Sequence, residues 1–398
     1  MGGNAGYLFY KDYYDGIDWR NLESDPNKKK YKEKSQQILN LELVTNINQP
    51  FQQSSNNLQT FDLKTTYPGL VIGTGYIHET GVEDEFKIGF YFDYTTGLPV
   101  ITGSSVKGVL RSAFPGRGEM YKGERTAYIK DLLEDILKKR QGFDSKSFDV
   151  NSIDVEALEN EIFEGIKDIN ANKERDKYQS IYERDIFHDA FPVKTGSTDG
   201  SKLFSDDFLT PHGDNPLKNP TPLKFLKVSP EVTFRFVFDL KDGRLKNGQN
   251  RTITITKDEK LNLFTTILFD FGVGAKTNVG YGQFDETAFY AETRRVQREQ
   301  QERDANERRR NIEEKLNKIE NPVEREIARI SMLDKDKMDG ELTEFYKKLD
   351  AFEEKDKKKA AEFIKECWSK NNKWKKQKKN QKDRVQRIKL ILGENDSR

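Results

Sequence analysis

Cysteine and histidine are scarce in this sequence of 398 residues, which contains one Cys and three His. The single cysteine, Cys367, cannot form an internal disulfide, and no Cys/His spacing resembles a zinc site. The histidines, His78, His188 and His212, lie far apart in the sequence, which favours a structural role over an acid–base centre. We therefore expect neither a metal nor a cofactor.

Long apolar runs are also missing from the sequence. No segment is hydrophobic enough to span a bilayer, and the first residues lack the apolar core of a signal peptide. We expect a cytoplasmic protein with no membrane partner. The net charge is only +1, but residues 291–398 carry 31 Lys+Arg against 24 Asp+Glu, so the preceding part is acidic overall. A nucleic-acid surface on that part would have to be a local patch.

Glycine is concentrated in one stretch, residues 271–284, which lies between a helical apolar pattern and an alternating one. Glycines permit φ > 0 and leave no Cβ in the way, so backbone N–H groups of such a loop can approach an anion closely. Lys276 is preceded by Ala275, which excludes a Walker A loop, and Thr277 stands where the dinucleotide fingerprint needs glycine. A glycine-rich turn with no ligand remains the alternative.

A second candidate anion site begins at Thr102. The run Thr-Gly-Ser-Ser predicts a helix start, and apolar residues then recur at helical spacing up to Phe114. Ser104, Lys107 and Arg111 share a different face of this helix. A serine at a helix N-terminus with two cations on the following turns can hold a phosphate. A solvated basic stripe is the alternative interpretation.

The order of the predicted elements indicates an α+β fold. Strands are expected at 58–76, 185–194, 232–240 and 281–289, and helices at 103–114 and 258–271. This βαββαβ order is that of the ferredoxin-like (RRM-like) split unit. A further alternating segment, 86–92, predicts a strand that pairs nearby.

The same patterns divide the chain into three parts. Residues 1–57 form an aromatic and helical segment that docks on the core, and 58–290 form the ferredoxin-like domain. That domain contains a helical insertion at 119–184 and an irregular excursion at 195–230, where a thumb-like hairpin would project. Residues 291–398 form a charged helical extension.

Two segments of the sequence resemble the motifs of a known family. PVITGSSVKGVLR at 99–111 and GVGAKTNVGYG at 272–282 are similar to the paired hallmarks of the RAMP superfamily, the RNA-binding subunits of CRISPR effectors. Further motifs resemble the sixth subunit of the type III-B (Cmr) complex: NAGYLFY at 4–10, FHDAFP at 187–192, LTPH at 209–212 and PLKFLKV at 222–228. The resemblance covers roughly residues 4–290 without the insertion.

The resemblance implies which residues hold guide-RNA phosphates. They are Ser104, Ser105, Lys107 and Arg111 of the first helix, and Gly274, Lys276, Thr277, Asn278, Gly280, Tyr281 and Gly282 of the glycine loop. Tyr281 has an alternative role as a core-facing residue at the start of a strand. The family's thumb corresponds to part of 195–230, and here His212 and Lys224 are the candidate RNA contacts.

The resemblance also implies the partners and the activity. The partners would be the guide RNA and its complementary target, the repeating backbone RAMP subunit, the adjacent terminal RAMP subunit and the small helical subunit. The chain would sit near the 3′ end of the guide and would not itself cut RNA. The alternative is a metal-dependent RAMP endoribonuclease, for which Asp206, Asp207 and His212 are the only constellation of interest.

The C-terminal extension has no counterpart in this resemblance. Helices are expected at about 293–320, 323–333 and 341–392, the last of them broken. Between Lys370 and Lys389 basic residues strongly outnumber acidic ones, with Trp368 and Trp374 close by. This composition is typical either of a single-stranded RNA surface or of a helix that binds a protein partner.

Overall fold

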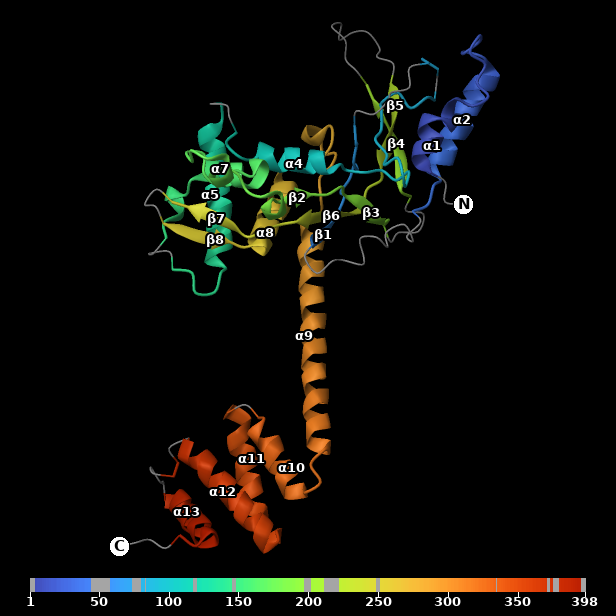
Figure 1. Cartoon of the computed structure of the whole chain (residues 1–398). Helices are drawn as coiled ribbons and strands as arrows, with labels where there is room; N and C mark the ends of the chain where they lie inside the picture. Colours follow the sequence, from blue (N-terminus) through green and yellow to red (C-terminus); the bar gives the residue numbers. More distant parts are fainter. Residues whose placement is uncertain are drawn as a thin grey trace. The chain divides into compact units, whose positions relative to one another are not determined.

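The computed structural model describes residues 4–43, 58–73, 80–82, 84–116, 120–144, 148–196, 202–210, 222–247, 251–333, 335–370, 373–374 and 379–394. The chain forms two compact units, Met1–Glu292 and Thr293–Arg398, whose elements are labelled in Figure 1. Three sequence predictions lie outside the described residues: the end of the first strand at 74–76, His78, and the segment that contains His212. In the described part of the chain, no helix is long and apolar enough to cross a membrane.

The first unit is built on an antiparallel sheet with β6 (Thr233–Asp239) in the middle. β1 (Gln59–Lys64) pairs with one side of it, and β2 (Ile186–Phe187) and β3 (Phe191–Lys194) pair with the other. Because side chains alternate along a strand, the three phenylalanines of β6 point to one face. They are Phe234, Phe236 and Phe238, all fully buried.

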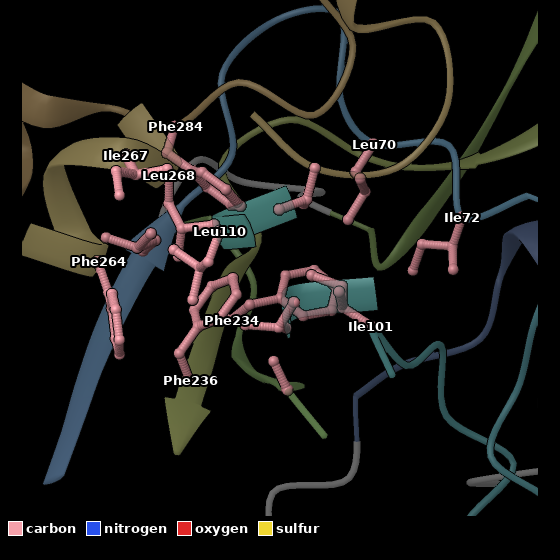
Figure 2. Close-up of a cluster of buried hydrophobic side chains, with 14 of the residues drawn as sticks. Leu70, Ile72, Ile101, Leu110, Phe234, Phe236, Phe264, Ile267, Leu268 and Phe284 are labelled. Atoms are coloured by element: carbon pink, nitrogen blue, oxygen red, sulfur yellow. The ribbon is translucent and has the colours of Figure 1, made fainter. Parts of the chain in front are cut away.

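Helices α4 (Gly103–Ser112) and α8 (Lys257–Phe271) cover that face of the sheet. Figure 2 shows Leu110 of α4 and Leu268 of α8 converging on Phe234. Thr256 and Glu259 form a capping box that starts α8, and Gly272 at φ 66° ends it. The predicted bounds of α8 are confirmed, and its last residue, Phe271, is 39% exposed.

The predicted fourth strand at 281–289 is wrong. Within the described residues its only sheet pairing is a single antiparallel bridge between Phe284 and Thr65 at the outer side of β1. Helix α9 (Glu286–Asn317) begins immediately afterwards, because Asp285 accepts the Ala288 N–H at 2.9 Å and caps the first turn. The expected strand at 86–92 is also absent as a regular strand.

The insertion is mainly helical and packs against α8. Its helical elements are α5 (Lys122–Lys138), α6 (Val155–Glu159), a π-helical turn (Asn160–Glu164) and α7 (Glu174–Lys177). A hairpin of β7 (Gly243–Lys246) and β8 (Thr252–Ile255), which the sequence analysis did not predict, lies close to it. Short 3₁₀ turns occur at Asp12–Tyr14, Val150–Ser152, Ile181–Glu183, Thr277–Val279 and Lys348–Ala351.

The N-terminal segment contributes α1 (Ala5–Tyr10) and α2 (Asp25–Leu39) to the same hydrophobic core. Phe9 and Tyr13 stack with Phe86 at centroid distances of 6.4 and 6.0 Å.

In the excursion, β4 (Phe204–Leu209) and β5 (Leu223–Val228) form an antiparallel hairpin. We refer to it below as the β4–β5 hairpin.

The second unit has its own core, formed by α10 (Pro322–Ser331), α11 (Lys335–Lys347), α12 (Glu354–Lys370) and α13 (Lys379–Leu392). Trp368 is only 4% exposed and belongs to this core. Trp374 packs against it beneath the Lys365 ammonium. Trp368 therefore cannot serve as an exposed stacking surface for RNA, as one interpretation of the sequence required.

Candidate nucleic-acid interface

The glycine loop, residues 272–282, is folded back on itself. The Val273 N–H donates to the Gly282 carbonyl at 2.9 Å, which closes its base. The Ala275 N–H donates to Val71 at 2.9 Å, and the Gly282 N–H donates to Gly69 at 2.8 Å. The loop is thus attached to the segment that follows β1.

Packing within the chain explains two of the glycines. A Cβ on Gly274 would lie 2.4 Å from the Val71 carbonyl oxygen, and one on Gly282 would lie 1.8 Å from that of Val273. Both residues also have positive φ, at 85° and 71°. These two positions need glycine whether or not a ligand binds.

The part of the loop that faces solvent is the arch Lys276–Val279. Lys276 has φ 61°, and Thr277–Val279 form a single 3₁₀ turn. Among the described residues, no acceptor bonds the backbone N–H of Thr277 or Asn278, and no carboxylate pairs with the Lys276 ammonium. Unpaired N–H groups at the start of a turn, next to a cation, are able to bind a phosphate oxygen.

Tyr281 points away from this arch. Its side chain is 8% exposed, and its hydroxyl donates to Asp207 of β4 at 2.7 Å. The Lys227 ammonium of β5 donates to the same carboxylate at 2.6 Å. Burial raises the pKa of Tyr281, and the hydrogen bond to Asp207 raises it further. The Tyr281 side chain thus faces the core, as the alternative interpretation of the sequence stated. Through its hydroxyl it connects the loop to the β4–β5 hairpin.

The N-terminus of α4 is partly occupied by groups from the chain itself. Thr102 caps the helix by accepting the Ser105 N–H, and the Gly103 N–H donates to Asp189 at 2.6 Å. Ser104 and Ser105 are exposed, with hydroxyls 2.9 Å from that of Thr102. Asp189 already supplies one negative charge here, which reduces the attraction of this helix end for a phosphate.

The two cations of α4 differ in their surroundings. Arg111 is held by Glu159 at 3.3 Å and by Glu164 at 2.7 Å, both from the insertion. Lys107 lies over the Phe187 ring at 5.8 Å and has no carboxylate partner among the described residues. Lys107 is therefore available to an anion, whereas Arg111 anchors the insertion to α4.

A series of backbone contacts connects the two clusters. Val71 forms an antiparallel β-bridge with Ala275. The Tyr91 N–H donates to the Ile72 carbonyl at 3.1 Å, and Phe92 forms a second β-bridge with Pro99, shortly before α4 begins. The segments that precede the arch and α4 are thus connected to each other through residues 71–72 and 91–92.

A comparison with known families now decides the identity of the fold. The family model described as RAMPs, RAMP superfamily, matches residues 62–285, which is more than half of the chain. The chain belongs to the RAMP superfamily. The match begins in β1 and ends at the residue before α9. Every RNA-contact residue that the family resemblance implied therefore lies within the RAMP domain, and the second unit lies outside it.

The chain is also similar to one curated protein and to chains in solved structures. The chain is 26% identical over 272 residues to the CRISPR system Cmr subunit Cmr6 of Pyrococcus furiosus, covering 62% of this chain and 73% of that protein. It resembles a chain in a cryo-EM structure of the type III-B Cmr-beta bound to cognate target RNA, with a TM-score of 0.38, 21% identity and coverage of 70% and 84%. The crystal structure of Cmr6 from Pyrococcus furiosus gives a TM-score of 0.29, 19% identity and coverage of 58% and 98%.

The β4–β5 hairpin of this RAMP domain holds its charges in pairs. Lys224 contacts Asp206 at 3.2 Å and Asp84 at 3.6 Å, and its side chain is only 12% exposed. Lys227 is neutralised by Asp207 on the other face of the hairpin. Lys224 as an RNA contact stays a prediction, and its pairing with two carboxylates weakens that prediction. Lys227 was not predicted as a functional residue, although the strand alternation places it on the opposite face from Lys224 and Leu226.

Within the described residues of the RAMP domain and of the second unit, no group of three His, Cys, Asp or Glu side chains is placed to hold a metal ion. Asp206 and Asp207 are consecutive in β4, so their side chains point to opposite faces of the hairpin. His212, the third member of the predicted constellation, lies outside the described part of the chain.

Proposed function

We propose that this RAMP protein is a guide-RNA-binding subunit of a type III-B CRISPR effector and that it does not itself cleave RNA. The observation that carries the proposal is the arch Lys276–Val279, where backbone N–H groups and a lysine that have no partner among the described residues lie side by side. This combination suits the backbone phosphate of an RNA strand, and the similarity to Cmr6 names the class of assembly.

The proposal includes a position in the complex. By analogy with the RAMP family, the arch and Lys107 hold phosphates near the 3′ end of the guide, and the β4–β5 hairpin serves as the thumb. The chain packs against the repeating backbone subunit, with the adjacent terminal RAMP subunit and the small helical subunit as further neighbours. The sheet order β1-β6-β2, with Phe284 bridging the outer side of β1, supports a ferredoxin-like core whose fourth strand is reduced to one bridge.

The pairing of the hairpin carboxylates supports a non-catalytic role. Asp207 is bound by Lys227 and Tyr281, and Asp206 is bound by Lys224. A metal-dependent nuclease needs carboxylates that converge on the ion, and these two diverge. The competing function, a RAMP endoribonuclease, would need His212 and a metal site that includes undescribed residues.

RNA binding is tested by fluorescence anisotropy with the purified full chain and labelled guide RNA over a range of salt concentrations. For single strands, log K falls with log salt by roughly 0.7 per neutralised phosphate. We expect Lys276→Ala to weaken binding and to reduce this slope, whereas Lys138→Ala, an exposed lysine of α5, changes neither. A wild-type chain that binds no guide RNA, alone or assembled with its partners, would refute the proposal.

Cleavage is tested separately by incubating the same protein with guide and target RNA in Mg²⁺. We expect no products. Cleavage that is lost in His212→Ala or Asp206→Asn would establish the nuclease alternative. Asp206 is the better carboxylate to change, because Asp207→Asn would also disturb the contact with Tyr281.

A further inference from the structure

Tyr67 is an aromatic side chain that the fold holds in solvent. It follows β1 in the turn 66–69, and it is 83% exposed. The turn itself is fixed, because the Thr66 N–H donates to the Gln283 carbonyl at 3.0 Å and the Gly69 N–H donates to Thr66 at 2.8 Å. An aromatic ring on a rigid turn loses little conformational entropy when a flat partner packs against it.

This turn lies directly beside the glycine loop. The Gly282 N–H donates to the Gly69 carbonyl at 2.8 Å, and a Cβ on Gly280 would lie 3.4 Å from Cδ of Pro68. Pro68 is thus in contact with the residue that follows the arch. Val279, the last residue of the arch, is 68% exposed, so an apolar surface flanks the unpaired N–H groups on that side.

A cation supports the ring from the protein side. The Lys227 ammonium lies 6.0 Å from the centroid of Tyr67 and 5.7 Å from that of Tyr281. The Lys227 side chain is only 8% exposed, and its hydrogen bond to Asp207 holds it in place. Tyr67 is therefore fixed both through its backbone and through a cation–π contact.

Exposure alone does not distinguish Tyr67. Tyr182, in the insertion, is 82% exposed, and Tyr94 is fully exposed. What distinguishes Tyr67 is its attachment to the loop that carries the arch. A nucleotide held by its phosphate on the N–H groups of Thr277 and Asn278 would have its base within reach of an adjacent aromatic ring, which is the arrangement used to bind single-stranded RNA.

We propose that Tyr67 is a base-stacking platform for one unpaired nucleotide of the RNA strand whose phosphates bind the arch Lys276–Val279. The inference rests on the proposed function and adds a contact to a base, which the phosphate contacts alone do not provide. Because every base has a flat π-face, stacking on Tyr67 strengthens binding without selecting a sequence.

The test uses the full chain and guide RNAs that carry 2-aminopurine at successive positions near the 3′ end. We expect Tyr67→Ala to weaken binding about 5- to 150-fold, from the usual contribution of about 1–3 kcal/mol per stacked base. The salt slope should stay unchanged, because no phosphate contact is lost. At one position, quenching of 2-aminopurine on binding should disappear in Tyr67→Ala and return in Tyr67→Phe. Tyr182→Ala is the control of equal exposure and should behave as wild type.

The outcomes separate this inference from the proposed function. If wild type binds RNA with a clear salt slope and Tyr67→Ala binds equally well, the stacking inference is wrong and the phosphate site stands. If Tyr67→Ala binds RNA normally but no longer joins the assembled complex, Tyr67 contacts a protein and the inference is overturned. If wild type binds no RNA, the proposed function fails and the inference fails with it.

Discussion

The Tyr281 hydroxyl donates a 2.7 Å hydrogen bond to the Asp207 carboxylate and so joins two segments that are 74 residues apart in the chain. The contact connects the glycine loop to the β4–β5 hairpin at a point where Tyr281 packs against the buried Phe225 of β5. This contact therefore holds together the loop that we propose to bind phosphates and the hairpin that we propose as the thumb.

Loss of this hydrogen bond should loosen both segments. We expect Tyr281→Phe to increase hydrogen exchange at 204–209 and 272–282 by about fivefold, since a hydrogen bond of this kind contributes about 1 kcal/mol. Mass spectrometry of peptides from the exchanged full chain measures this. Tyr67→Phe, which removes an exposed hydroxyl nearby, is the matched control. Unchanged exchange in Tyr281→Phe would mean that the contact does not hold the loop.

The same contact predicts a dependence of stability on pH. Burial raises the pKa of Asp207, but hydrogen bonds from Lys227, Tyr281 and the Phe208 N–H outweigh it, and the pKa lies below its usual range. A carboxyl with a lowered folded-state pKa stabilises the fold above its unfolded value of about 4 and loses that effect as the pH falls through the folded value. The pKa of Tyr281 is raised, so its contribution is complete below about pH 10 and is lost above it.

We therefore expect wild type to be more stable than Asp207→Asn at pH 7 and the difference to shrink below about pH 4. Thermal unfolding of both proteins across the pH range measures it. Asp131→Asn, an exposed position of α5, should show no such trend. A difference that stays constant down to pH 2 would contradict the assignment of the effect to the Asp207 carboxylate.

Gly282 of the loop and Gly108 of α4 should respond differently to alanine. In Gly282→Ala the new Cβ meets the Val273 carbonyl oxygen and φ is positive, so we expect a loss of at least about 2 kcal/mol. A Cβ on Gly108, inside α4, meets nothing within 4 Å, so Gly108→Ala should stabilise the fold by about 0.5–1 kcal/mol. Calorimetric melting temperatures test both.

Gly108→Ala also serves as a probe of the proposed interface. If RNA backbone approaches this turn of α4 closely, the variant should be more stable and yet bind guide RNA more weakly. Equal RNA affinity would place the RNA away from Gly108, while a fall in stability would mean that the helix is not regular there.

Substitutions of Lys107 and Arg111 should have different effects, because we expect Lys107 to contact RNA and Arg111 to anchor the insertion. Lys107→Ala should weaken guide binding on the order of five- to tenfold at low salt, about 1 to 1.4 kcal/mol, and leave stability unchanged. Arg111→Ala removes the ion pairs with Glu159 and Glu164, so it should increase hydrogen exchange at 155–164. The reverse pattern, with Arg111 controlling RNA affinity, would restore it as a phosphate contact.

Local patterns in the sequence determined several parts of this protein. The capping box at Thr256 and Glu259 and the apolar spacing behind it set α8, and the alternating phenylalanines set β6, because both signals depend on neighbouring residues only. The four glycines with Lys276 marked the loop 272–282 for the same reason. Each of these features could be predicted without knowing what lies opposite it.

Only the tertiary structure decided which side chains are free. Arg111 and Lys107 have equivalent positions in the helical pattern, yet the insertion neutralises one and leaves the other. Tyr281 resembles a loop residue in sequence, but it is buried and its hydroxyl donates a hydrogen bond to Asp207 of a distant strand. The predicted strand after Tyr281 gives way to a helix capped by Asp285. Contacts between segments far apart in the chain depend on how the whole core packs, and that information is not present in any single stretch of residues.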